Sequence, residues 1–267
     1  GADAPAPPLF ARVIRDVGRT LVLDHKTQSA ARDEHIYHES LVHPALLMHP
    51  NPKTVYIGGG GELATARELL KHSSIEEVVM VDIDEVAVDI CREQLPEWGD
   101  GAADDPRLKL FYTDAYAWLD RDDEATGTFD IIVMDIADPI EAGPGIALYT
   151  SEFYELAKRK LRPGGVLVTQ SGPGGLITHT ECLTAIHNTL RSNFEHVLPF
   201  IAEIPSFGCP RRGFEASPFL ARARMSRPAR SIEHARIPAD PKLERARADR
   251  VGHEAQLPRP PSLSPPP

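Results

Sequence analysis

The ten residues Val55–Ala64, VYIGGGGELA, determine how the rest of the chain is interpreted. Three apolar residues lead into four glycines, a pattern typical of a buried strand that ends in a tight turn before a helix. Gly59-x-Gly61-x-x-Ala64 loosely fits the dinucleotide-binding fingerprint, although a simple turn would show the same glycines. Glu62 would repel a pyrophosphate and attract a sulfonium or an ammonium group. The stretch therefore favours a cationic ligand over NAD.

Outward from this glycine loop (residues 58–63), the sequence alternates between short apolar runs and amphipathic stretches. We expect strands at 55–57, 78–81, 108–111, 131–134 and 166–169, and a last strand at 197–204 that Pro199 interrupts. We expect helices at 63–72, 85–94, 151–161 and 178–194. Near-continuous apolar strands that alternate with helices predict a mostly parallel sheet covered on both faces, which is the doubly wound α/β architecture. Ligands of such sheets bind at the carboxyl ends of the strands.

The sequence predicts three segments. Residues 1–50 hold a short N-terminal β-hairpin region, with a β-type run at 20–24, and a helix from Asp33 to Met48 that leads into the sheet. Pro44 weakens this helix prediction because proline removes a backbone donor. Residues 51–215 form the α/β domain. Residues 216–267 are rich in Pro, Arg and Ala without periodicity, so we expect this tail to be disordered.

The composition of the 267 residues restricts the classes of protein. There are 29 Lys and Arg against 39 Asp and Glu, a formal net charge of −10, which argues against nucleic acid as a partner. Residues 211–267 hold 12 basic and 6 acidic residues, so residues 1–210 carry −16. No apolar run approaches the ~20 residues that span a bilayer, so we expect no membrane association. Three widely spaced cysteines give neither a disulfide framework nor a zinc pattern, and the histidines form no metal spacing, so we expect a cytoplasmic chain without a metal.

Acidic residues follow the second and third strands of the predicted sheet. Asp82 ends the second strand, about 20 positions after the glycine loop, where nucleotide-binding sheets place the acid that binds a ribose diol, with a helix cap as the alternative. We expect Asp84 to cap the next helix. Asp114, after the third strand, fits two interpretations equally well: it accepts a hydrogen bond from an adenine amino group, or it caps a helix.

Three acids follow the fourth strand, namely Asp135, Asp138 and Glu141. Like charges so close together raise each other's pKa unless a cation lies between them. The cluster therefore predicts a site that holds a polycation and accepts its proton, with an acidic surface loop as the alternative.

Taken together, these residues resemble the aminopropyltransferase family, the spermidine, spermine and thermospermine synthases. The resemblance extends over about residues 20–215. Its motifs are Val22-Leu23-Asp24, Gln28, Asp33-Glu34, Tyr37-His38-Glu39, His49-Pro50-Asn51-Pro52, Gly59-Gly60-Gly61-Glu62, Asp82-Ile83-Asp84, Asp114-Ala115, Asp135-x-x-Asp138-Pro139 and Ile204-Pro205-Ser206-Phe207. Within the family, the stretches YHESLVHPALL (37–47), ADPIEAGP (137–144) and TQSGPGG (169–175) are most similar to the thermospermine synthases of plants and algae.

The resemblance implies a Rossmann-like domain of the S-adenosylmethionine type behind a small N-terminal β region, and a homodimer or a higher homo-oligomer. It implies decarboxylated S-adenosylmethionine as co-substrate, no tightly bound cofactor, and spermidine as the polyamine acceptor, with thermospermine as product and methylthioadenosine released. The donor-binding residues that it implies are Gln28, Gly59, Gly61, Glu62, Asp82, Asp114 and Ala115. It implies Asp135 as the catalytic acid/base residue. It implies an acceptor channel lined by Tyr37, His38, Asp138 and Phe207.

The sequence departs from the family in several places. Gly58 stands where the family usually has an apolar residue, and Leu63 stands where it usually has glycine, so we expect Leu63 to crowd the donor. The N-terminal β region is shorter than the family's, and the tail does not resemble the family. Three alternatives stay open: an S-adenosylmethionine-dependent methyltransferase, a catalytically inactive donor-binding relative, and an aminopropyltransferase whose product is spermine or spermidine.

Overall fold

The structure, a computed structural model, describes residues 18–23, 26–121, 127–139, 143–175, 178–180, 182–207, 215–216 and 219–222. The chain divides into two units, residues 1–226 and 227–267, and all described residues belong to the first. Glu141 and Cys209 lie outside the described residues. So do residues 223–267, which make up most of the tail for which the sequence predicts disorder.

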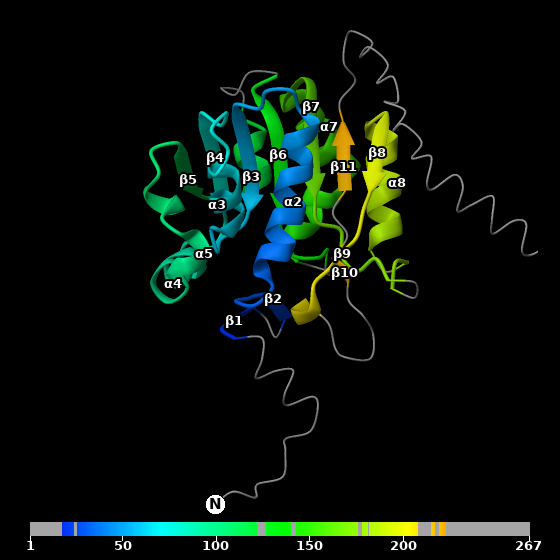
Figure 1. Cartoon of the computed structure of the whole chain (residues 1–267). Coiled ribbons are helices and arrows are strands. Elements are labelled where there is room, and N and C mark those ends of the chain that lie inside the picture. The colour runs from blue at the N-terminus through cyan, green and yellow to red at the C-terminus, as the bar shows by residue number, and fades with distance from the viewer. Residues whose placement is uncertain are drawn as a thin grey trace, which may run out of the picture. The chain divides into compact units, whose positions relative to one another are not determined.

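A seven-stranded sheet forms the centre of the first unit, in the order β5-β4-β3-β6-β7-β11-β8 (Figure 1). Its strands are β3 (Thr54–Gly59), β4 (Glu77–Asp82), β5 (Leu108–Tyr112), β6 (Phe129–Asp135), β7 (Leu161–Thr169), β8 (His196–Pro199) and β11 (Phe219–Arg222). Strands β5, β4, β3, β6 and β7 pair in parallel, and β11 lies antiparallel between β7 and β8. The predicted mostly parallel, doubly wound sheet is confirmed.

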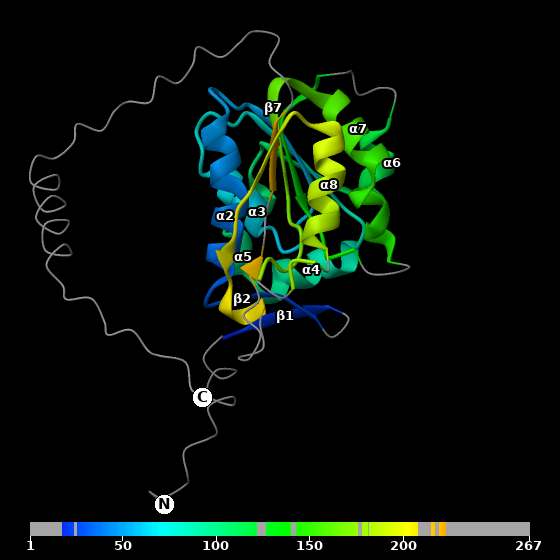
Figure 2. The ribbon, with the colours of Figure 1, turned by 90° about the vertical axis from the view of Figure 1, so that its right-hand side faces the viewer.

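Helices cover both faces of the sheet, as the side view in Figure 2 shows. One face is covered by α2 (Glu34–Met48) and α3 (Ala64–Leu70), and the other by α6 (Ala115–Leu119), α7 (Ser151–Lys160) and α8 (Leu183–Asn193). Within β6, Ile131 and Val133 pack toward α2 and α3, whereas Ile132 and Met134 pack toward the opposite helices. A strand buried on both faces must be apolar at every position, which explains the near-continuous apolar runs of the sequence.

Smaller elements gather at the edge where the parallel strands end. The hairpin of β1 (Thr20–Leu23) and β2 (Lys26–Ala30) lies below this edge in Figure 1. The remaining elements are α4 (Glu85–Gln94), α5 (Pro96–Gly99), η1 (Ala102–Asp104), η2 (Pro144–Tyr149), β9 (Ala202–Glu203), η3 (Pro205–Phe207) and β10 (Glu215–Ala216). Among the described residues, no helix is long and apolar enough to cross a membrane.

The predicted helix from Asp33 to Met48 is confirmed, and it continues through Pro44 because its buried face packs into the core and outweighs one lost backbone hydrogen bond. Other predicted boundaries differ from the structure. The last helix begins at Leu183 rather than near 178, and the hydroxyl of Thr184 donates to the carbonyl of His179 in the preceding turn. The predicted strand 197–204 is two strands, β8 and β9, which belong to different sheets. Strand β11 (219–222) lies beyond the predicted limit of the α/β domain at 215 and pairs with β7 and β8.

Candidate active site

The glycine loop approaches the end of β6 so closely that a side chain would not fit. Gly59 and Gly60 adopt positive φ angles of 83° and 79°, which glycine adopts at little cost. A Cβ atom on Gly59 would lie 2.1 Å from the carbonyl oxygen of Asp135, and the amide of Gly60 donates to that oxygen at 2.9 Å. The glycines therefore bring the loop, and with it Glu62, against the end of the strand that carries Asp135.

Asp135 accepts a hydrogen bond on each carboxylate oxygen. The hydroxyl of Tyr37 donates to Oδ1 at 2.6 Å, and the hydroxyl of Thr65 donates to Oδ2 at 2.5 Å. Burial, and then the charge of Glu62, raise the pKa of Asp135 above its ordinary value, against the opposing effects of His38 and the two hydroxyls. This side chain is thus a carboxylate poised to take up a proton.

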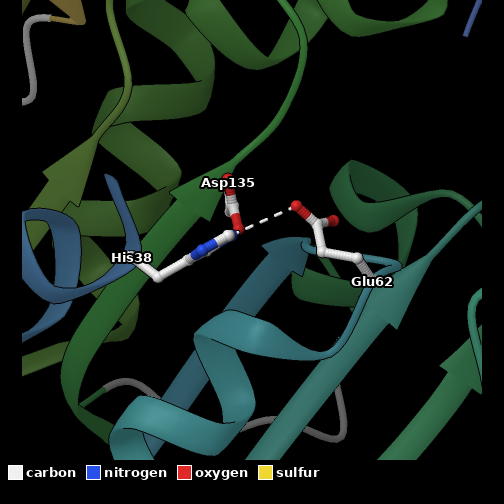
Figure 3. A group of neighbouring side chains, drawn as sticks. All are labelled: His38, Glu62 and Asp135. Atoms are coloured by element: carbon white, nitrogen blue, oxygen red, sulfur yellow. Dashed lines mark hydrogen bonds and ion pairs between the residues drawn. The ribbon is translucent and has the colours of Figure 1, made fainter. Parts of the chain in front are cut away.

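Four charged side chains form a buried series of contacts, and Glu62 stands at one end of this series. Arg67 pairs with both oxygens of Glu34 at 3.0 and 2.9 Å, and Glu34 Oε2 lies 2.9 Å from Nδ1 of His38. On the other side of the ring, Nε2 of His38 lies 3.1 Å from Glu62 Oε1. Figure 3 shows His38, Glu62 and Asp135 converging from α2, the glycine loop and the end of β6.

These contacts set the charges of the series. Burial alone would lower the pKa of His38, but its hydrogen bonds to Glu34 and Glu62 raise it to about 10. Burial raises the pKa of Glu62, but the hydrogen bond and charge of His38 lower it. The net pKa of Glu62 is below the ordinary value of a glutamate. At neutral pH, His38 is therefore an imidazolium between two carboxylates.

One atom each of His38, Glu62 and Asp135 lies within 4.8 Å of the others, a spacing that would also suit a metal ion. A metal would need the neutral imidazole of His38, whereas its pKa of about 10 keeps it protonated at neutral pH. The donor set therefore fits an organic cation beside Glu62 and Asp135 better than a metal.

The residues expected in an acceptor channel are held by separate contacts. Asp138 accepts a hydrogen bond from Nε2 of Gln170 at 2.6 Å. The ring of Phe207 meets the ring of Tyr37 edge-on, with centroids 5.4 Å apart. Tyr37 thus joins Phe207 to Asp135, whereas His38 is fully buried behind Glu62.

The residues expected to bind a donor form a second group. The Asp82 carboxylate lies against the glycine loop, because a Cβ on Gly61 would be 3.0 Å from its Oδ2. Burial is the largest cause of the raised pKa of Asp82, and Glu62 adds to it. Asp82 also accepts from the amide of Asp84 at 2.9 Å, and Asp84 caps α4 as predicted.

Three further residues expected to bind the donor substrate are held by local contacts. Asp114 caps α6, accepting from the amide of Ala117 at 2.7 Å, and it is exposed. The carbonyl of Ala115 accepts from the hydroxyl of Tyr56 at 2.8 Å. Gln28 lies in β2, where its amide donates to the carbonyl of Lys26 at 3.4 Å. These contacts do not link the three residues to Asp135.

Leu63 is part of the buried core and packs against α5. It is 2% exposed, and a Cβ on Gly99 would lie 3.2 Å from the Leu63 Cβ. Glu62 and Leu63 also line one wall of a cavity of about 470 Å³, whose other walls come from α4, α5 and η1.

The sequence predicts Glu62, Asp135 and Tyr37 as site residues, and it gives no role to four residues that contact the candidate site. These are Glu34, Thr65, Arg67 and Gln170. Glu34 stood in a motif, so a weak signal existed. Thr65 and Arg67 lie on the amphipathic helix α3, whose period indicates a buried face but not the partner that this face meets.

Known proteins resemble the chain in this same region. Residues 34–214 match the family described as the spermine/spermidine synthase domain. The thermospermine synthase ACAULIS5 of Arabidopsis thaliana is 53% identical over 191 residues, which are 71% of this chain and 55% of that protein. A polyamine aminopropyltransferase of Aeropyrum pernix is 49% identical over 191 residues, 71% of this chain and 59% of that protein. The chain thus spans little more than half the length of these two relatives.

Solved structures agree with the sequence relatives. A spermidine synthase in complex with the transition state analogue AdoDATO superposes with a TM-score of 0.71 and 28% identity, over 78% of this chain and 67% of that one. The spermidine synthase of Thermotoga maritima gives a TM-score of 0.68 and 27% identity, over 78% and 66% of the two chains. The chain belongs to the spermine/spermidine synthase family.

Proposed function

We propose that the chain transfers the aminopropyl group of decarboxylated S-adenosylmethionine to spermidine, giving thermospermine and methylthioadenosine. The observation that carries this proposal is the pairing of Asp135, held by two hydroxyls, with Glu62 at the carboxyl edge of the sheet. Two carboxylates side by side suit a reaction in which an ammonium must be bound and another must lose its proton.

The chemistry assigns Asp135 the role of base. The attacking nitrogen of the acceptor must be neutral, and an amine with a pKa of ~10.4 gives up its proton at pH 7 at a cost of roughly 4–5 kcal/mol. The neutral amine forms a bond to the carbon next to the sulfonium, the carbon–sulfur bond breaks, and its electron pair neutralises the sulfur. Asp135 takes the proton that leaves the nitrogen, while Tyr37 orients the carboxylate and Phe207 and Asp138 flank the acceptor.

The other residues bind the donor in this proposal. Glu62 receives the ammonium of the aminopropyl group, and Asp82 receives the ribose hydroxyls beside Gly59 and Gly61. Gln28, Asp114 and Ala115 would surround the adenosine, with Asp114 accepting from the adenine amino group while it caps α6. In this proposal His38 supports Glu62 and does not contact the acceptor, because its ring is fully buried and lies within hydrogen-bond distance of Glu62, at 3.1 Å.

Support for thermospermine as the product comes from the 53% identity to the Arabidopsis thermospermine synthase. The product depends on which end of spermidine reaches Asp135: the aminopropyl end gives thermospermine and the aminobutyl end gives spermine. Chromatography of the polyamines formed from decarboxylated donor and spermidine tests this choice. Spermine as the main product would contradict it, and putrescine as the better acceptor would make the enzyme a spermidine synthase.

Release of methylthioadenosine tests the reaction itself. We expect Asp135→Asn to reduce turnover by a factor of about 10²–10⁴, as loss of a general base does, with donor affinity retained. Asp120→Asn, which changes an exposed acid at the end of α6, is the matched control and should keep full activity. A folded wild-type protein that releases no methylthioadenosine would support the inactive relative instead.

Donor binding separates the proposal from a methyltransferase. Intact S-adenosylmethionine carries a carboxylate that Glu62 should repel, so we expect calorimetry to show tighter binding of the decarboxylated donor. Glu62→Gln should reduce the difference in binding affinity between the two donors. Preference of the wild type for intact S-adenosylmethionine would contradict the proposal.

A further inference from the structure

Thr65, in α3, contacts the carboxylate of Asp135 through its hydroxyl. It is the second residue of the helix and is fully buried. Its Oγ1 lies 2.5 Å from Asp135 Oδ2, while Tyr37 occupies Oδ1 at 2.6 Å. Each carboxylate oxygen therefore has its own hydroxyl donor, one from α2 and one from α3.

The surroundings of Asp135 make these donors matter. Four titratable groups face the carboxylate or act on its charge: Tyr37 and His38 on α2, Glu62 in the glycine loop and Tyr149 on η2. Burial and the negative charge of Glu62 both favour the neutral acid. Hydrogen bonds to the ionised form oppose them, and such bonds to a charged group are stronger than those between neutral groups.

The hydroxyl of Thr65 is directed at Oδ2 inside the core. Threonine in a helix has two favoured rotamers, and the one present here places the fully buried hydroxyl 2.5 Å from that oxygen. Tyr37 lies farther out, against Phe207, where an acceptor would arrive. Thr65 is the donor that an incoming acceptor would not displace.

We propose that Thr65 is a positioning residue that holds Asp135 in its ionised form and in one orientation for proton transfer. The catalytic consequence rests on the proposed aminopropyl transfer. The contact itself, and its effect on Asp135, do not depend on which reaction the chain performs.

The first experiment compares Thr65→Val, which keeps the shape and removes the hydroxyl, with Thr65→Ser, which keeps the hydroxyl. The lost hydrogen bond should raise the pKa of Asp135, so the acid limb of kcat/KM should move to higher pH by about one unit in Thr65→Val. The rate should fall about tenfold on that limb and approach the wild-type value on the alkaline plateau. Thr65→Ser should follow the wild-type profile.

Thr54→Val is the matched control. The hydroxyl of Thr54 also lies within hydrogen-bond distance of a carboxylate, 3.2 Å from Asp130 Oδ2 and 3.0 Å from the carbonyl of Thr128, but at the opposite edge of the sheet. This variant should lose stability and leave the pH profile in place. A shift of the profile in Thr54→Val equal to that in Thr65→Val would mean that the effect is merely structural and would overturn the proposal.

The second experiment has a readout that needs no turnover. Titration of ¹³C-labelled aspartate carboxyls by NMR, with the Asp135 resonance assigned from Asp135→Asn, should show a higher midpoint for Asp135 in Thr65→Val than in the wild type. Thr65→Ala serves if Thr65→Val does not fold. An unchanged midpoint in the folded variant would overturn the role of Thr65, whereas absent turnover in the wild type, with a shifted midpoint, would overturn only the proposed function.

Discussion

His38 carries its charge inside the protein because carboxylates face both nitrogens of its ring. Its side chain is fully buried, with Glu34 at 2.9 Å and Glu62 at 3.1 Å. Arg67 completes the set on the far side of Glu34, whose pKa falls to about 2 because His38 and Arg67 outweigh the effect of burial. Removing one member of a buried ion pair leaves the other uncompensated, which is why such networks respond sharply to substitution.

The charge of His38 predicts how stability depends on pH. The pKa of His38 is about 10 in the folded protein against 6.5 for an ordinary histidine. Because the folded value is the higher one, the stabilisation is complete below pH 6.5 and is lost as the pH rises toward 10. We expect the free energy of unfolding to fall by a few kcal/mol over this interval, as measured by urea denaturation at about pH 6, 8 and 10.

In His38→Gln, the free energy of unfolding should decrease less between pH 6 and 10, because glutamine does not titrate. Near pH 6 this variant should be less stable than the wild type. His35→Gln is the matched control, since His35 is exposed on the same helix, and it should keep the wild-type slope. An equal slope in His38→Gln and the wild type would show that another group causes the pH dependence.

At the residue scale, the sequence predicted the acids but not what surrounds them. Glu62 and Asp135 follow strands of a parallel sheet, so their meeting at one edge could be inferred from order alone. The contacts of Thr65 and Arg67 join α3 to β6 and α2, and they depend on how those elements pack. Periodicity does not encode such partners, because it gives a direction within one helix and no information about the next.

At the element scale, the start of α3 combines an unfavourable backbone with a favourable side chain. Leu63 precedes the helix with a φ of 70°, in the left-handed region, which costs a non-glycine residue roughly 1–2 kcal/mol. Its side chain is buried in the core beside Gly99. The buried leucine thus offsets the cost at a position where the family usually has glycine.

Two substitutions at Leu63 separate these contributions. Both Leu63→Ala and Leu63→Gly lose the buried side chain and should destabilise the protein by about 2–5 kcal/mol, less any strain relieved. Only glycine relieves the backbone, so Leu63→Gly should be more stable than Leu63→Ala by about 1 kcal/mol in urea denaturation. The order should reverse at Ala66, inside the same helix, where Ala66→Gly should cost about 1 kcal/mol. If Leu63→Gly is the less stable of the pair, the left-handed conformation does not exist in solution.

Elements with a strong pattern were predicted well, and those with a non-local origin were not. The strands from β3 to β7 contain short apolar runs and are separated by helices, so their type and parallel order follow from the sequence. Strand β11 has four residues in a segment rich in Arg, Pro and Ala, and it exists through pairing with β7 and β8. Nothing local distinguishes such a strand from its surroundings, because strand propensity depends on neighbours.

At the scale of the whole molecule, residues 1–210 are strongly acidic, and some of that charge lies at the candidate site. Residues 1–210 carry −16, and the basic residues after 210 reduce the formal charge to −10. Asp82 and Asp135 end strands of the parallel sheet, and Glu62 and Asp138 follow such strands, so all four lie at its carboxyl edge. His38 neutralises part of this charge, but the remaining carboxylates favour a cationic ligand at that edge.

This distribution predicts that salt weakens acceptor binding much more than donor-product binding. The proposed acceptor, spermidine, is a polycation, so its attraction to partly exposed carboxylates should be screened as the Debye length shortens from about 10 Å at 0.1 M salt to about 3 Å at 1 M. We expect its Kd, measured by calorimetry, to rise roughly tenfold over that range. Methylthioadenosine is uncharged and serves as the matched control ligand, with a Kd that should change less than about twofold. A spermidine affinity that ignores ionic strength would mean that hydrogen bonds and packing, rather than the acidic edge of the sheet, select the acceptor.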